Sequence, residues 1–86
     1  MNTAAGIHYS LHTKREVCVC RLRRALADVR GALKKARREL FEMSCALQRR
    51  PETLQHTGAR VLSLTAEIQE LEQRQDVLEE AIQQLE

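Results

Sequence analysis

Apolar residues recur along two stretches of the chain at alternating spacings of three and four residues. In the first stretch they are Val19, Leu22, Leu26, Val29, Leu33, Ala36, Leu40, Met43 and Leu47. In the second they are Leu54, Val61, Leu64, Ile68, Leu71, Leu78, Ile82 and Leu85, with Thr57 and Gln75 at the remaining positions of the same period. Because this alternation keeps one stripe of a helix facing a neighbouring helix, it predicts two long helices packed along a coiled-coil seam.

Pro51, the only proline, separates the two stretches. Proline disrupts the interior of a helix but suits its first turn, where its missing N–H is not needed. Glu52 then places a negative charge at the positive end of the helix dipole. We therefore predict a bend at about 50–52 and a second helix at about 52–86, with a start delayed to about Gly58 as the alternative.

The chain before the first stretch contains one local signal for a helix start. Thr13 followed by Glu16 fits a capping box, in which each side chain satisfies a backbone N–H at the helix terminus. The first helix is therefore expected at about 13–49. Residues 1–12 lack helical periodicity and are expected to form a flexible N-terminal segment.

A fold-back at residue 52 brings the two apolar stripes into register. An antiparallel pair then sets Leu40 opposite Leu64 and Leu33 opposite Leu71. The seam of this hairpin is built mainly from Leu22, Leu26, Leu33, Leu40, Leu64, Leu71 and Leu78. The competing arrangement is a parallel dimer through the second helix. It is disfavoured because Glu67 would face Glu72 of the other chain.

Charge supports the same architecture. The formal net charge is +2, but residues 1–50 carry about +8 and residues 51–86 about −6. The positions that flank the antiparallel seam on one side hold Arg23, Arg30 and Arg37 in the first helix and Glu72, Glu79 and Glu86 in the second. The sequence thus predicts an all-α fold, an antiparallel two-helix coiled-coil hairpin. Pairing of two hairpins into a four-helix bundle is left open.

The composition argues against an enzyme and against a metal or cofactor site. A chain of 86 residues in one helical layer offers no water-excluded pocket, and no nucleophile–base pair or Gly-rich phosphate loop is recognisable. The only plausible metal ligands are Cys18, Cys20, His8, His12 and His56. Side chains two residues apart on a helix diverge by about 200°, so the two cysteines are not expected to share a metal.

The expected location is the cytoplasm, without membrane association. Three cysteines, an odd number, fit reduced thiols better than a disulfide framework, and Cys45 is expected to be a small residue near the bend. Residues 1–13 contain no apolar run long enough for a signal peptide, and no apolar stretch reaches the length of a membrane span.

Small and apolar residues outside the seam indicate where a protein partner binds. Ala25, Ala32, Val77 and Ala81 lie on one side of the predicted hairpin, and Phe41 and Leu62 face each other across it on the opposite side. Small residues permit close approach of a further helix, so a helical client or co-chaperone is the expected partner. The basic residues Arg21, Arg24, Lys34, Lys35 and Arg38 are expected to form a solvated face. Nucleic-acid binding is disfavoured there because acidic residues interrupt the face and no aromatic residues interleave.

The chain also resembles the small E-component chaperones of type III secretion needle subunits, which are short cytosolic helical hairpins. The resemblance covers roughly residues 20–85 and rests on the size, the two-helix layout, Pro51–Glu52 and the run Leu78-Glu79-Glu80-Ala81-Ile82. It implies binding, together with a co-chaperone, to an aggregation-prone needle protein in the bacterial cytoplasm. The function expected is therefore a protein-binding module, an adaptor or chaperone that buries a partner's amphipathic helix. The alternatives are a structural homo-oligomer, as small as a homodimer, and a nucleic-acid-binding basic helix.

Overall fold

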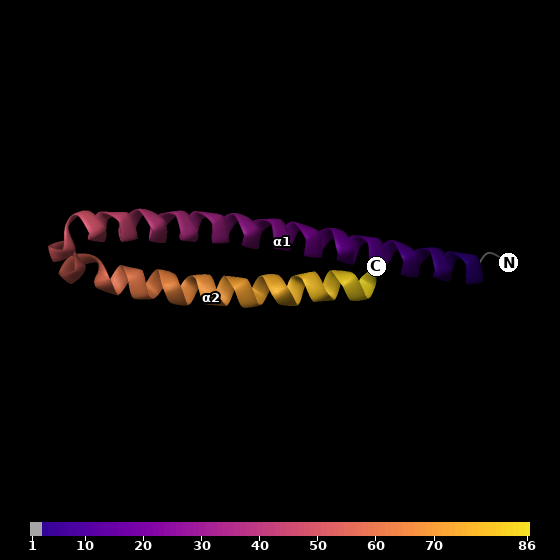
Figure 1. Cartoon of the computed structure of the whole chain (residues 1–86). Helices are drawn as coiled ribbons and strands as arrows, with labels where there is room; N and C mark the ends of the chain where they lie inside the picture. Colours follow the sequence, from indigo (N-terminus) through magenta and orange to yellow (C-terminus); the bar gives the residue numbers. More distant parts are fainter. Residues whose placement is uncertain (1–2) are drawn as a thin grey trace.

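Two antiparallel helices lying side by side make up the protein (Figure 1). The computed structural model describes the backbone of residues 3–86 and the side chains of residues 14–86. Helix α1 spans Thr3–Arg49, a single turn of 3-10 helix, η1, spans Pro51–Thr53, and helix α2 spans Leu54–Leu85. The predicted all-α helical hairpin is confirmed.

The start of α1 differs from the prediction. The helix begins at Thr3, so the backbone is already helical on both sides of Thr13 and this residue does not cap the helix. A Thr-x-x-Glu sequence is compatible with a helix interior, and residues 3–12 contain no proline to stop the helix. A flexible segment was expected at 1–12. The side chains of these residues lie outside the described part of the chain.

The bend is a short hydrogen-bonded turn. Arg50 leaves the helical conformation (φ −136°, ψ 83°), and Pro51 takes the first position of η1, where no N–H donor is required. The backbone N–H and the side-chain hydroxyl of Thr53 both donate to the carbonyl oxygen of Arg50, at 3.0 and 2.8 Å. The Leu54 N–H donates to the Pro51 carbonyl, and α2 starts there rather than near Gly58.

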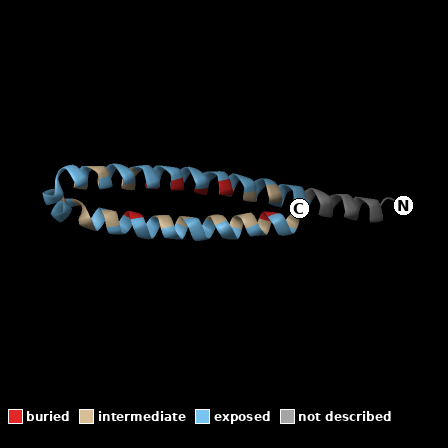
Figure 2. Ribbon diagram, viewed as in Figure 1, coloured by how far each residue is buried: buried red, intermediate tan, exposed pale blue. Residues whose placement is uncertain are grey.

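The core is a single seam between the helices (Figure 2). Its buried members are Leu26, Val29, Leu33, Ala36, Leu64 and Ile82. Of the leucines assigned to the seam, the remaining four, Leu22, Leu40, Leu71 and Leu78, are half-buried. Removal of these side chains from water is the main force that holds the helices together. Leu54 is the exception at the seam positions, because it is 57% exposed at the start of α2.

The hairpin is a rod. It measures 76 × 16 × 14 Å, and its radius of gyration of 20.7 Å exceeds the roughly 12 Å expected of a compact domain of this length. Every residue outside the seam is therefore close to the surface. Among the described residues, the accessible surface lies on the two flanks of the seam and on the outer sides of the helices.

Ion pairs run along one flank of the seam. Arg30 Nη2 lies 3.2 Å from Glu79 Oε1, Arg37 Nη2 lies 3.1 Å from Glu72 Oε2, and Arg23 pairs with Glu86. We call this flank the ladder face. Exposed pairs contribute only about 0–1 kcal/mol each, but three pairs of one polarity favour the antiparallel orientation over the alternatives.

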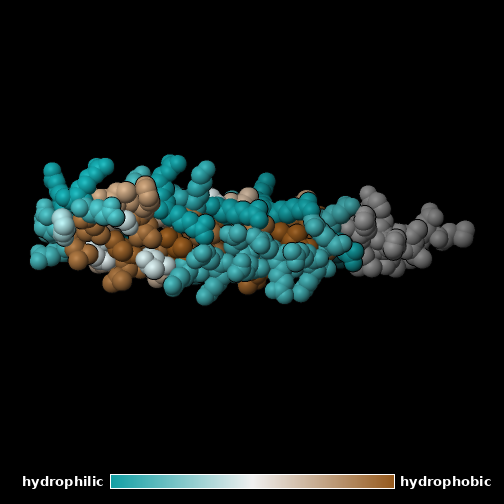
Figure 3. All heavy atoms as spheres, in the orientation of Figure 1, coloured by the Kyte–Doolittle hydropathy of each residue, from teal (hydrophilic) through white to brown (hydrophobic). Residues whose placement is uncertain are grey.

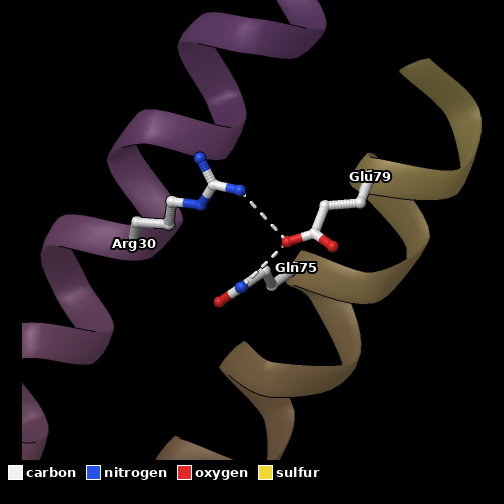
Figure 4. A network of polar contacts seen from close by, with 3 residues as sticks. All are labelled: Arg30, Gln75 and Glu79. Atoms are coloured by element: carbon white, nitrogen blue, oxygen red, sulfur yellow. Dashed lines mark hydrogen bonds and ion pairs between the residues drawn. The ribbon is translucent and has the colours of Figure 1, made fainter. Parts of the chain in front are cut away.

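The middle of this ladder includes a polar seam residue (Figure 4). Gln75 is half-buried, and its Nε2 donates a hydrogen bond of 2.9 Å to Glu79 Oε1, the atom that Arg30 also reaches. The hydrogen bonds from Gln75 and Arg30 hold the pKa of the Glu79 carboxyl below its ordinary value. The seam thus accommodates an amide because a carboxylate one turn away accepts a hydrogen bond from its N–H.

We expect Leu33→Asp and Leu64→Asp each to destabilise the hairpin by several kcal/mol, because an unpaired carboxylate would lose its hydration in the seam. Far-UV circular dichroism during thermal unfolding measures the effect. Ala66→Asp, on the exposed outer side of α2, is the matched control and should melt close to the wild type. Melting of both seam variants at the wild-type temperature would contradict the seam described above.

We expect the hairpin to lose stability as the pH falls through the lowered pKa of Glu79. A carboxyl whose pKa is depressed by folding contributes its stability above the unfolded pKa, ~4.3, and loses it below the folded one. Melting temperatures measured between about pH 6 and pH 3 should therefore fall, and Glu79→Gln should reduce the fall. Glu80→Gln removes a carboxylate that makes no ion pair within the described residues and should retain the wild-type pH dependence. Equal pH profiles for Glu79→Gln and the wild type would refute this role.

Candidate protein-binding surfaces

The predicted contact residues lie on opposite flanks of the seam. Phe41 and Leu62 are on the ladder face, near the bend. Ala25, Ala32, Val77 and Ala81 lie on the other flank, toward the open end of the hairpin, and we call this flank the small-residue face. The structure thus forms two separate candidate surfaces.

The small-residue face contains a hollow that reaches the seam. Its volume is about 310 Å³, and its apolar lining comes from Ala32, Ala36 and Leu64. Ala36 and Leu64 are buried seam residues, and the short side chain of Ala32 leaves the gap above them. Farther along this flank, Val77 is 65% exposed, while Ala25 and Ala81 are half-buried. Apolar surface is therefore accessible from this side without disruption of the hairpin.

Charged side chains of both signs border the hollow. They are Lys35, Glu39, Arg60 and Glu67. Glu39 accepts two hydrogen bonds from Arg60, 3.0 Å from Nε to Oε1 and 2.9 Å from Nη2 to Oε2. The hydrogen bond to Arg60, followed by the positive charges of Arg60 and Lys35, lowers the pKa of Glu39. The same hydrogen bond raises the pKa of Arg60 above its ordinary value.

The Glu39–Arg60 pair was not recognised from the sequence. The sequence did contain a signal for this pair. Glu39 directly precedes the seam residue Leu40, and Arg60 directly precedes the seam residue Val61. In an antiparallel pair of helices these positions face each other on the flank opposite the ladder. The pair fixes the relative position of the helices at one end of the hollow.

Three large apolar side chains near the bend form a second surface on the ladder face, which we call the bend patch. Phe41 is 68% exposed, Leu62 is 73% exposed and Leu54 is 57% exposed. Figure 3 shows hydrophobic residues of both helices gathered at the bend end of the molecule, while hydrophilic side chains cover much of the remaining length. Leu54 was expected in the seam, and only the structure assigns it to this surface.

The outer side of α1 is basic. Arg21, Arg24, Lys34, Lys35 and Arg38 are exposed there, and none of them belongs to an ion pair among the described residues. Lys34, Lys35 and Arg38 surround a shallow hollow of about 260 Å³ at Gly31, where no side chain fills the space. Asp28 and Glu42 lie on the same side of the helix. The arrangement can attract anions, but it offers no aromatic platform for nucleic-acid bases.

Among the described residues, the three cysteines and His56 form no recognisable site. Cys18 and Cys20 are exposed, Cys45 is half-buried, and all three are free thiols. Within the described part of the chain, no three His, Cys, Asp or Glu side chains converge in a way that could hold a metal ion. The side chains of His8 and His12 lie outside that part. Neither helix, over the same residues, has an apolar segment long enough to cross a membrane.

The two surfaces on the flanks of the seam are therefore the strongest functional candidates of the described chain. Comparisons with known proteins do not add to this assignment. No protein-family model, no curated protein and no solved structure matches this chain.

Proposed function

We propose that this chain is a protein-binding module, an adaptor or chaperone that buries a partner's amphipathic helix against the small-residue face. The observation that carries the proposal is the hollow at Ala32, which lies over the buried seam residues Ala36 and Leu64. A closed two-helix coiled coil needs no such opening for its own stability. The opening leaves room for the side chains of a third helix.

Binding would follow from the shape of this face. Alanines at Ala25, Ala32 and Ala81 permit a close approach, and packed helices in proteins lie about 8–10 Å apart. Each Å² of apolar surface removed from water contributes about 25 cal/mol. A helix with apolar residues at i, i+3, i+4 and i+7 matches a groove of this kind. The positive and negative side chains that border the hollow contribute to selectivity among partners more than to affinity.

A chaperone role follows if the client exposes this apolar stripe when it is alone. Covering the stripe prevents the client's self-association, and release needs only dissociation of one helix. The resemblance to the E-component chaperones makes a type III secretion needle subunit, with its co-chaperone, the first client to test. The site of action would then be the bacterial cytoplasm.

We expect Ala32→Arg to abolish partner binding while the hairpin stays folded. The long side chain fills the hollow, and its charge can pair with Glu67 across the seam, so stability is retained. The partner is first isolated by stoichiometric co-purification with the wild-type chain and then titrated calorimetrically. The variant should bind at least about tenfold more weakly.

The matched control is Ala66→Arg, which adds the same side chain on the exposed outer side of α2. It should bind the partner as the wild type does. Circular dichroism confirms the helical content of both variants. Wild-type affinity of Ala32→Arg would exclude the small-residue face as the binding surface.

A further inference from the structure

The bend patch lies in a region of the ladder face that carries no charge. Phe41, Leu54 and Leu62 are its exposed apolar members, and the neighbouring positions on the same face hold Ser44, Gln48, Gln55 and Thr65. The remainder of this face, from Arg37 and Glu72 to the open end, is the ion-pair ladder. An uncharged, apolar area next to a charged one is typical of the core of a protein interface.

We propose that the bend patch binds the same patch of a second copy of this chain. The two hairpins would be related by a two-fold axis parallel to their long axes, with both bends at the same end. This symmetry lays α1 of each copy over α2 of the other. Phe41 of one copy then meets Leu62 of the other, twice, because the two residues lie opposite each other across the seam.

Charge complementarity selects a second copy and this orientation. Residues 1–50 carry about +8 and residues 51–86 about −6, so α1 of one copy meets a helix of opposite charge. At the edge of the patch, Lys34 on α1 faces the acidic α2 of the other copy. The reverse orientation, with the bends at opposite ends, would lay α1 on α1 and bring like charges together.

The ladder limits the length of the contact. Full-length packing of two ladder faces would remove the three Arg–Glu pairs of each copy from water, and the desolvation penalty of buried ion pairs offsets much of their attraction. The contact is therefore centred on the bend. The open ends of the two hairpins, including both small-residue faces, remain accessible.

The exposed area of the rod is consistent with such a contact. The accessible surface is 7164 Å², whereas a compact monomer of 9.9 kDa exposes about 5,200 Å². The difference of about 2,000 Å² is spread over the whole rod, and an interface of standard size needs ~800 Å² from each partner. Leu54, a seam residue that the hairpin itself does not cover, would be covered in the pair.

Light scattering coupled to size-exclusion chromatography, over a range of concentrations, tests the pairing. The wild-type chain should reach twice its monomer mass of 9.9 kDa. Phe41→Glu combined with Leu62→Glu should remain monomeric with unchanged helical content, and either single variant should raise the dissociation constant at least about tenfold. Val77→Glu replaces an equally exposed apolar residue on the other flank and should dimerise as the wild type does.

A spin label tests the orientation. Gln83, exposed near the open end of α2, is replaced by cysteine in a chain whose Cys18, Cys20 and Cys45 are serine, and the distance between labels is measured by double electron–electron resonance. With the two bend patches in contact, bends at the same end place the open ends side by side and give a short distance, whereas opposed bends point the open ends away from each other and give a long distance comparable to or greater than the 76 Å length of the rod. The proposal is overturned by a monomeric wild type at every concentration, by a dimeric double variant, or by the long distance.

These outcomes are independent of the client-binding proposal. Ala32→Arg lies on the opposite flank and should still dimerise. Conversely, the double variant at Phe41 and Leu62 should still bind a client through the small-residue face. Loss of both activities in one variant that keeps its helical content would show that the two surfaces are not separate.

Discussion

A single apolar seam between α1 and α2 holds this protein together, and its other features depend on that seam. The buried residues, among them Leu33 and Leu64, form one row rather than a three-dimensional core. A row of this kind can be extended only by lengthening the helices, which produces the rod shape. Among the described residues, every buried side chain belongs to this row.

The two flanks of this seam differ in charge and in the size of their side chains. On the ladder face, Arg30 and Glu79 continue the polarity set by a basic α1 and an acidic α2, and the charges end before the bend. On the opposite flank, Glu39 and Arg60 form the strongest pair, bidentate and of reversed polarity. Beyond that pair the side chains become small, and the hollow at Ala32 lies over the buried Ala36 and Leu64.

The two proposed contacts use these differences in separate ways. The bend patch is bulky, uncharged and self-complementary, which suits a symmetric contact between identical chains. The small-residue face is hollowed and bordered by both charges, which suits a helix of different sequence. Because the surfaces lie on opposite flanks of the seam, a paired hairpin would present two client sites at once. Two linked sites raise the apparent affinity for a client that is itself oligomeric.

The sequence by itself determined the seam, the bend and the ladder. Heptad spacing, the position of Pro51 and the charges at Arg30 and Glu79 are properties of residues at fixed separations along a helix, so helical geometry translates them directly into contacts. The local start signal at Thr13 misled, because a capping sequence does not start a helix where the preceding residues are already helical.

Only the tertiary structure decided what remains exposed. Leu54 has the period of a seam residue, yet it stays uncovered where the helices meet the bend, and the hollow at Ala32 depends on the side chains of both helices. The spacing of apolar residues predicts which side of a helix a residue occupies. Exposure depends also on the distance to the neighbouring helix and on the size of its side chains, and these are properties of the packed pair.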